Sequence, residues 1–263
     1  MSRTKPSIVI LGTGNVAYAL GIALFKNGYP IKQVYSRSHE KALQLARKLK
    51  ASFTDDLRAI EIDASVYLLA ISDDALPEFC KALPRLGGIV MHTSGSIPLS
   101  VLKKQNHTAV IYPLQTLQKD HQPEWQKTSF LVEANDEVGL KMVKSIARTL
   151  TKKVIQCTSE ERKQVHLAAV IASNFSNHLF ALSQDILQSN KLPTDLLAPL
   201  IEETIKKSLK GDAKTKQTGP ARRGDQTILR KHLNMLNNDP LTKSIYKQIS
   251  ASIQKMYSKK SKK

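Results

Sequence analysis

The feature that most constrains the fold is a glycine turn near the amino end of the chain. It lies between an apolar run at residues 7–11, where we predict the first strand, and a helix-like stretch at residues 15–27. Small residues in such a turn let backbone N–H groups and a helix N-terminus approach a pyrophosphate. The alternative is a turn that only packs, but the G-x-G-x-x-A spacing after a strand favours a dinucleotide site. The residues expected at the pyrophosphate are Gly12, Thr13, Gly14, Asn15 and Val16.

Short β-branched runs alternate with helix-like stretches through the first half of the chain, which favours a parallel sheet flanked by helices. Further strands are predicted at residues 31–36, 66–71, 89–92, 110–112, 130–133 and 154–156. Further helices are predicted at residues 40–50, 74–83 and 136–149. The pattern changes near Thr158, so we expect a dinucleotide-binding domain over residues 1–156 and a helical domain over residues 157–263.

The second part of the chain begins with one long predicted helix, over residues 159–189. Thr158 and Glu161 have the spacing of a capping box at its start. Its apolar residues surround nearly the whole circumference, which is typical of a buried helix. Helices follow at residues 194–209, 226–237 and 240–257, around a Gly- and Lys-rich loop at 210–225. The predicted fold class is therefore α/β, a doubly wound, mainly parallel Rossmann sheet followed by an all-α domain.

The end of the second predicted strand indicates which dinucleotide binds. NAD sites place an Asp or Glu there to accept hydrogen bonds from the ribose hydroxyls. No acidic residue occurs between Gly28 and His39, and Ser36, Arg37 and Ser38 offer two hydroxyls and a guanidinium to a 2′-phosphate. We therefore predict NADP(H) as the cofactor, with an exposed loop arginine as the alternative.

Two loops that follow predicted strands are expected to border the nicotinamide. Ligands of open α/β sheets bind beyond the carboxyl ends of the strands. Ile71 and Ser72 follow one strand, and Ser94 and Gly95 follow the next. For Asp73, in the first loop, a cap on the following helix is the alternative to a site role.

The chain resembles bacterial proteins that join a Rossmann-like NADP-binding domain to an uncharacterised helical C-terminal domain. The resemblance is carried by residues 12–17, 92–96, 112–116, 173–178 and 218–225, of which the last, Thr218-Gly219-Pro220-Ala221-Arg222-Arg223-Gly224-Asp225, is the most specific. Such proteins are labelled NADP or deazaflavin-coenzyme oxidoreductases. They are similar in layout to 6-phosphogluconate dehydrogenase-like and pyrroline-carboxylate reductase-like enzymes, and the resemblance implies a substrate site between the sheet and the helical domain.

The long predicted helix carries a stripe of polar residues at spacings of three or four. His166, Asn174, Asn177 and His178 share this stripe, so they would lie on one face. Such groups need partners when buried, either in the chain itself or in a ligand. We predict a substrate site, in which Asn174 orients the substrate and Asn177 and His178 contact it.

The proton donor is predicted from a departure from the related enzymes. In those dehydrogenases this helix carries a Lys one turn before an Asn, and if Asn174 matches that Asn, the Lys position is Val170. We therefore expect His166, one turn from Val170, to exchange the proton, with His92 as the second candidate. This is a hypothesis from spacing.

Two guanidiniums in the loop at residues 218–225 could clamp an anionic substrate group. Arg222 and Arg223 lie between glycines that shape the loop. The alternative is structural: Asp225 would cap the next helix and pair with one of the arginines.

The net charge of +18 is concentrated at the carboxyl end, where residues 201–263 hold 16 Lys or Arg against 5 Asp or Glu. Nucleic-acid binding through this part is an alternative, but no aromatic platform or known motif accompanies the charge, so we expect a solvated tail. No apolar run approaches the roughly 20 residues of a membrane span, and Cys80 and Cys157 lack metal-ligand spacing. We expect a cytoplasmic homodimer with a small-molecule substrate, no metal and no membrane association.

These features predict an NADP-dependent oxidoreductase that transfers a hydride to or from a small polar carbonyl, imine or hydroxy compound. The alternative is a non-catalytic NADP-binding sensor or scaffold protein, which Val170 at the Lys position favours.

Overall fold

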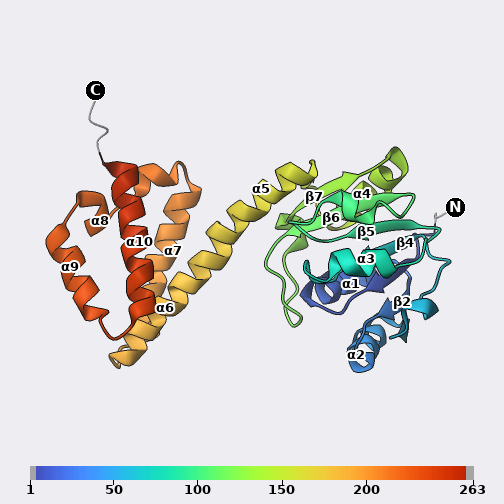
Figure 1. The fold of residues 1–263 in the computed structure, drawn as a ribbon, viewed down its shortest axis with the longest axis horizontal. Helices are drawn as coiled ribbons and strands as arrows, with labels where there is room; N and C mark the ends of the chain where they lie inside the picture. Colours follow the sequence, from blue (N-terminus) through green and yellow to red (C-terminus); the bar gives the residue numbers. More distant parts are fainter. Residues whose placement is uncertain (1–3, 259–263) are drawn as a thin grey trace. The chain divides into compact units, whose positions relative to one another are not determined.

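The computed structural model describes residues 4–258 (Figure 1). The chain divides into two compact units, Met1–Phe175 and Ser176–Lys263, and each is described by itself. The domain boundary expected near residue 156 precedes the first helix of the long helical segment and stays a prediction. The last lysines of the basic tail, residues 259–263, lie outside the described residues.

The first unit contains an eight-stranded sheet with the strand order β3-β2-β1-β4-β5-β6-β7-β8. β7 is antiparallel to β6, and the other neighbouring pairs are parallel. The mainly parallel α/β fold is thus confirmed. Because the chain reverses its direction of travel across the sheet after β3, a ligand crevice is expected at the carboxyl ends of β1 and β4. The strands are β1 (Ile8–Leu11), β2 (Ile31–Tyr35), β3 (Ser52–Thr54), β4 (Val66–Leu69), β5 (Ile89–His92), β6 (Thr108–Leu114), β7 (Ser129–Ala134) and β8 (Val154–Gln156).

Helices cover both faces of this sheet because successive strand residues point to opposite sides. Ile8 and Ile10 pack in one core with residues of α1 (Asn15–Lys26), α2 (His39–Leu49) and α4 (Glu137–Leu150). Val9 and Leu11 pack in a second core with α3 (Leu76–Ala82) and the 3₁₀ turn η2 (Leu99–Leu102). The two cores fill the two faces of the sheet with apolar side chains. The other 3₁₀ turns of the unit are η1 (Leu57–Ala59) and η3 (Trp125–Lys127).

The second unit is helical, and α10 lies between α7 and α9 in the view of Figure 1. An apolar cavity of about 320 Å³ lies among α6, α8 and α10. Its elements are α6 (Ser176–Ser189), η5 (Thr194–Leu197), α7 (Ala198–Leu209), η6 (Ala213–Lys216), α8 (Pro220–Arg223), α9 (Gln226–Met235) and α10 (Pro240–Tyr257).

The long predicted helix is continuous but not uniform. It consists of α5 (Ser159–Ala169), a π-helical segment η4 (Val170–Phe175) and α6. The expectation that it is buried is wrong for the chain itself: Leu167, Ile171 and Phe175 are 55%, 54% and 57% exposed. These three side chains belong to the first unit, whose sheet does not cover them. By length and composition, Ser159–Ser189 is the one helix among the described residues that could cross a membrane.

Candidate active site

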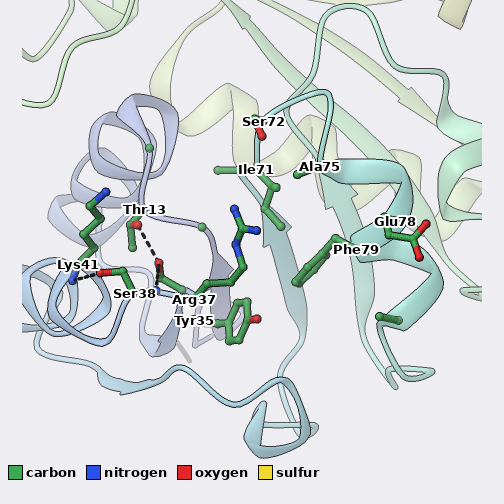
Figure 2. A pocket seen from close by; sticks show the side chains of 15 residues that line it. Thr13, Tyr35, Arg37, Ser38, Lys41, Ile71, Ser72, Ala75, Glu78 and Phe79 are labelled. Atoms are coloured by element: carbon green, nitrogen blue, oxygen red, sulfur yellow. Dashed lines mark hydrogen bonds between the residues drawn. The ribbon is translucent and has the colours of Figure 1, made fainter.

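A cavity of about 610 Å³ opens at the carboxyl ends of β1, β2 and β4 (Figure 2). It extends from the glycine turn to α3, over the loop that leads from β2 into α2. The predicted cofactor residues that line it are Gly12, Thr13, Gly14, Ser36, Arg37, Ser38, Ile71 and Ser72. The structure therefore brings together residues from three separate segments that the sequence analysis assigned to one ligand.

The glycine turn brings β1 close to β4 and leaves the start of α1 open. Gly12 has φ 120°, and a Cβ there would lie 2.2 Å from the carbonyl oxygen of Ala70. Gly14 is the N-cap of α1 without a side-chain cap, and the first turn of α1, which begins with Asn15 and Val16, holds no acidic residue. These N–H groups and the helix dipole fit an anion such as a pyrophosphate.

Two cations stand at the other end of the cavity. Figure 2 shows Arg37 projecting between Lys41 on the α2 side and Phe79 on the α3 side. Arg37 and Lys41 are exposed, and neither forms an ion pair within residues 4–258. The carboxylate of Glu78, which also lines the cavity, is paired with Lys81 at 3.0 Å. The donors that remain fit a phosphate group.

Sequence reasoning missed Lys41 and Phe79. Lys41 lies in the first turn of α2, where the helix dipole disfavours a cation. That unfavourable placement next to Ser38 is the signal that could have identified it. Phe79 lies on α3, far from the glycine turn in sequence, and its apolar character alone carried no such signal.

The predicted serines shape the loop that presents Arg37. Thr13 Oγ1 donates to Ser36 Oγ at 3.1 Å, and the backbone N–H of Ser38 donates to the same oxygen at 3.3 Å. Ser38 Oγ accepts from the backbone N–H of Lys41 at 3.4 Å and caps α2. The serines therefore fix the loop as well as lining the cavity.

A second polar cluster forms where α5 meets the loop after β5. Tyr112, at the end of β6, and His166, on α5, are joined by a hydrogen bond of 3.0 Å between the phenol oxygen and Nδ1. Their rings meet edge to face with centroids 5.8 Å apart. A Cβ on Gly95 would lie 2.7 Å from His166 Nδ1 and 2.8 Å from Tyr112 Cζ. Burial, and secondarily the charge of Asp73, raise the pKa of Tyr112.

Tyr112 was not predicted as a site residue. It begins the segment 112–116, which carries part of the family resemblance, and it is the last residue of a predicted strand. That position was the available signal, but its partner lies 54 residues away in sequence. Only the fold brings the two rings together.

Ser94 and His92 are enclosed. Ser94 is 7% exposed, and its hydroxyl accepts from the backbone N–H groups of Ser96 and Ile97 at 3.1 and 2.9 Å, so it closes the turn after β5. His92 is 0% exposed, and burial followed by the charge of Arg162 lowers its pKa to about 3. His166 is half-buried and therefore better placed to meet a ligand than the enclosed His92, and the roles of both histidines stay predictions.

Arg162 is a fully buried charge that sequence analysis did not single out. Its guanidinium forms an ion pair with Glu133 of β7 and donates to the carbonyl oxygen of Ile97 at 2.6 Å. It therefore connects the first turns of α5 to the sheet and to the loop after β5.

The remaining predicted residues lie on exposed surfaces. Asn174 lies in η4, where π-helical geometry changes the spacing assumed from sequence. Asn177 and His178 are exposed at the start of α6. Arg222 lies over the ring of Tyr257 at 4.2 Å, and Arg223 is exposed beside it. Asn177, His178 and the two arginines belong to the second unit, and their role at the site stays a prediction.

Two family models match the chain. Residues 7–91 match the family model described as NADP oxidoreductase, coenzyme F420-dependent, and residues 128–253 match a domain of unknown function, DUF2520. The chain is 38% identical to a putative NADP oxidoreductase from Bacteroides fragilis, with a TM-score of 0.90 over 96% of this chain and 99% of that chain. The chain belongs to this NADP oxidoreductase family.

Other solved structures share the fold. A protein from Thermotoga maritima, TM1727, is 26% identical with a TM-score of 0.78, over 95% of this chain and 99% of that chain. A reductive aminase from Aspergillus terreus, solved with NADPH and ethyl-5-oxohexanoate, is 14% identical with a TM-score of 0.72, over 96% and 93% of the two chains. The latter likeness concerns the fold alone. No curated protein matches the chain.

Proposed function

We propose that the protein is an NADP-dependent oxidoreductase that transfers a hydride to or from a small polar carbonyl, imine or hydroxy compound. The observation that carries the proposal is the pair of cations, Arg37 and Lys41, at a cavity of about 610 Å³ that begins at the glycine turn. A 2′-phosphate distinguishes NADP from NAD, and guanidinium and ammonium groups are its usual partners. Membership of the NADP oxidoreductase family supports the same cofactor.

The residues around the cavity support a proposed position for each part of the cofactor. The backbone around Gly12, Gly14 and Asn15 would hold the pyrophosphate, and Arg37, Lys41 and the two serines beside them the 2′-phosphate. Ile71, Ser72 and Gly95 would border the nicotinamide. Bound NADPH supplies the hydride, and the chain must supply the proton.

His166 is proposed to exchange that proton. When the hydroxyl of Tyr112 donates to Nδ1, the proton of the neutral imidazole resides on Nε2, the nitrogen left for a substrate. Tyr112 thus sets the tautomer and the ring orientation. General acid catalysis of this kind contributes roughly 10²- to 10⁴-fold. Asn174 is proposed to orient the substrate, and Asn177, His178, Arg222 and Arg223 to contact it.

A homodimer is part of the proposal. The apolar side chains of Leu167, Ile171 and Phe175 in α5 and η4 are exposed, and a second copy offers the same apolar residues as a partner. A membrane is the poorer cover, because His166, Asn174 and Asn177 would be costly in lipid. The free thiols Cys80 and Cys157 fit a reducing compartment such as the cytoplasm.

Titration calorimetry with NADPH and NADH tests the cofactor assignment. We expect NADPH to bind at least about tenfold more tightly than NADH, and Arg37→Ala to weaken NADPH binding about 10- to 100-fold, since hydrogen bonds to charged groups contribute roughly 1.5–3 kcal/mol. NADH affinity should change little. The matched control is Arg58→Ala, an exposed arginine in η1 that pairs with Asp56. Equal affinities for both nucleotides, or unchanged preference in Arg37→Ala, would overturn the assignment.

A further inference from the structure

Asp73 has a carboxylate next to Ser72, a residue that lines the cofactor cavity, and the proposed function does not use this carboxylate. It lies in the turn between β4 and α3 and is half-buried. A helix cap is not its role, because the N-cap of α3 is Ala75 and has no side-chain cap bond. Asp73 instead accepts a hydrogen bond from Ser96 Oγ, in the loop after β5. The carboxylate is thus fixed across two loops that face the carboxyl edge of the sheet.

The position of Asp73 links the cofactor cavity to the Tyr112–His166 pair. Its neighbour Ser72 lines the cavity. Its partner Ser96 follows Gly95, which packs against both rings of the pair. Burial, and after it the charge of Asp73, raise the pKa of Tyr112.

The charge of Asp73 is not neutralised by the protein. The fully buried cation next to this region, Arg162, is paired with Glu133. Within residues 4–258, no Lys, Arg or His forms an ion pair with Asp73. A half-buried carboxylate without a protein cation is a suitable partner for a cationic ligand.

We propose that Asp73 makes the site select protonated imines over neutral carbonyl compounds, an inference that rests on the proposed function. Hydride addition from NADPH to the carbon of a protonated imine gives a neutral amine and NADP⁺, so the site holds one positive charge before and after the step. Hydride addition to a ketone gives NADP⁺ and an alkoxide that must take a proton, and a fixed carboxylate repels that alkoxide. Asp73 therefore favours the first reaction through its charge.

Binding of a matched pair of probes to the NADPH-loaded protein, in which neither probe can be reduced, tests the proposal without relying on turnover. Pyrrolidine, a cation at pH 8, and cyclopentanol, its neutral counterpart of similar size, are titrated by calorimetry. We expect pyrrolidinium to bind about tenfold more tightly, and Asp73→Asn to abolish the difference. Ser96→Ala should reduce it, because the hydroxyl holds the carboxylate in place. The control Asp74→Asn removes an exposed neighbouring charge and should leave the preference unchanged.

Measuring NADPH affinity on these variants distinguishes a failure of the Asp73 proposal from a failure of the cofactor assignment. NADPH affinity is measured on the same variants, and Asp73→Asn should leave it within about twofold. Equal binding of the two probes, no measurable pyrrolidinium binding, or an unchanged preference in Asp73→Asn would overturn the role of Asp73 even if NADPH binds as proposed. In turnover assays with NADPH, the inference predicts reduction of 1-pyrroline in preference to cyclopentanone, and the reverse preference would also contradict it.

Discussion

The absence of a side chain at Gly95 allows the loop after β5 to contact α5. A Cβ on Gly95 would lie within 2.8 Å of both His166 and Tyr112, so the glycine permits the hydrogen-bonded pair to sit against the loop. At Gly87, by comparison, the nearest atom to an added Cβ would be the carbonyl oxygen of Ile62 at 4.0 Å. The two glycines therefore differ in what a methyl group would cost.

Gly95→Ala is expected to reduce the free energy of unfolding by about 1–3 kcal/mol, the usual cost of overpacking. Gly87→Ala should change it by less than about 0.5 kcal/mol. Urea denaturation of both variants measures the difference. Equal stability of the two variants would show that the contacts around Gly95 are not close-packed.

His92 predicts a specific pH dependence of stability. Its pKa is lowered to about 3 in the folded chain, against 6.5 for an ordinary histidine. Between these values the unfolded chain binds the extra proton, so this contribution to stability is complete above pH 6.5 and is lost as the pH falls. We expect the free energy of unfolding to fall by about 1.4 kcal/mol per pH unit between pH 6 and 5 because of this one group.

His92→Asn keeps an acceptor for the Ser94 N–H and removes the titration, so the slope between pH 6 and 5 should become shallower by that amount. The exposed His121 provides the control, and His121→Asn should leave the slope unchanged. An identical slope in wild type and His92→Asn would contradict the enclosed, neutral imidazole.

At the scale of single residues, the glycine turn and Arg37 were singled out because a phosphate site needs those residue types next to a strand end. They line one cavity in the structure, and their role in binding stays a prediction. Tyr112 and Arg162 could not be singled out, because their roles depend on partners 54 and 29 residues away in sequence.

At the scale of elements, the ion pair between Arg162 of α5 and Glu133 of β7 holds the helix against the sheet. Arg162 is 0% exposed, and the side chain of Glu133 is 17% exposed. Removing one partner of a buried pair leaves the other charge without compensation, which costs about 3–5 kcal/mol. The pair is therefore expected to dominate the attachment of α5.

A double-mutant cycle tests this attachment. Arg162→Met and Glu133→Gln should each reduce the free energy of unfolding by about 3–5 kcal/mol, and the double variant should lose clearly less than the sum. The exposed pair Lys81 and Glu78 serves as the comparison and should give coupling below about 1 kcal/mol. Additive losses for Arg162 and Glu133 would contradict their interaction.

Most elements were predicted from periodicity, and the exceptions have physical causes. β5, β8 and α10 begin and end at the predicted residues. Turns delimit the two strands, and Asp239 and Pro240 mark the start of α10. β3 was missed because three residues, Ser52–Thr54, carry too little pattern. The π-helical segment η4 was missed because the apolar residues around it fit an ordinary helix as well. Among the predicted site residues, Asn174 lies within η4, so the spacing predicted from an ordinary helix does not hold for it.

At the scale of the whole molecule, the apolar pattern of residues 159–189 predicts a buried helix. Leu167, Ile171 and Phe175 on this helix are nevertheless exposed. Ile171→Asp places a charge on the uncovered face, at a residue that is 54% exposed. If a second copy covers this face, the variant should dissociate the wild-type dimer into monomers, as measured by light scattering.

The matched control for the dimer is Ile62→Asp, an exposed isoleucine of the first unit that is 67% exposed. It should leave the dimer intact. A wild-type monomer, or a dimer that tolerates Ile171→Asp, would contradict the proposed interface. Partition of the wild-type chain into lipid vesicles would instead indicate a membrane as the cover.

The central claim is that NADPH binds across the glycine turn with its 2′-phosphate at Arg37 and Lys41. The most direct measurement is the free energy of unfolding in urea with and without NADPH. At a free NADPH concentration of 100 times the Kd, the folded chain should gain about 2.7 kcal/mol, and the same concentration of NADH should give a clearly smaller gain. An unfolding curve that saturating NADPH leaves unmoved would contradict the account.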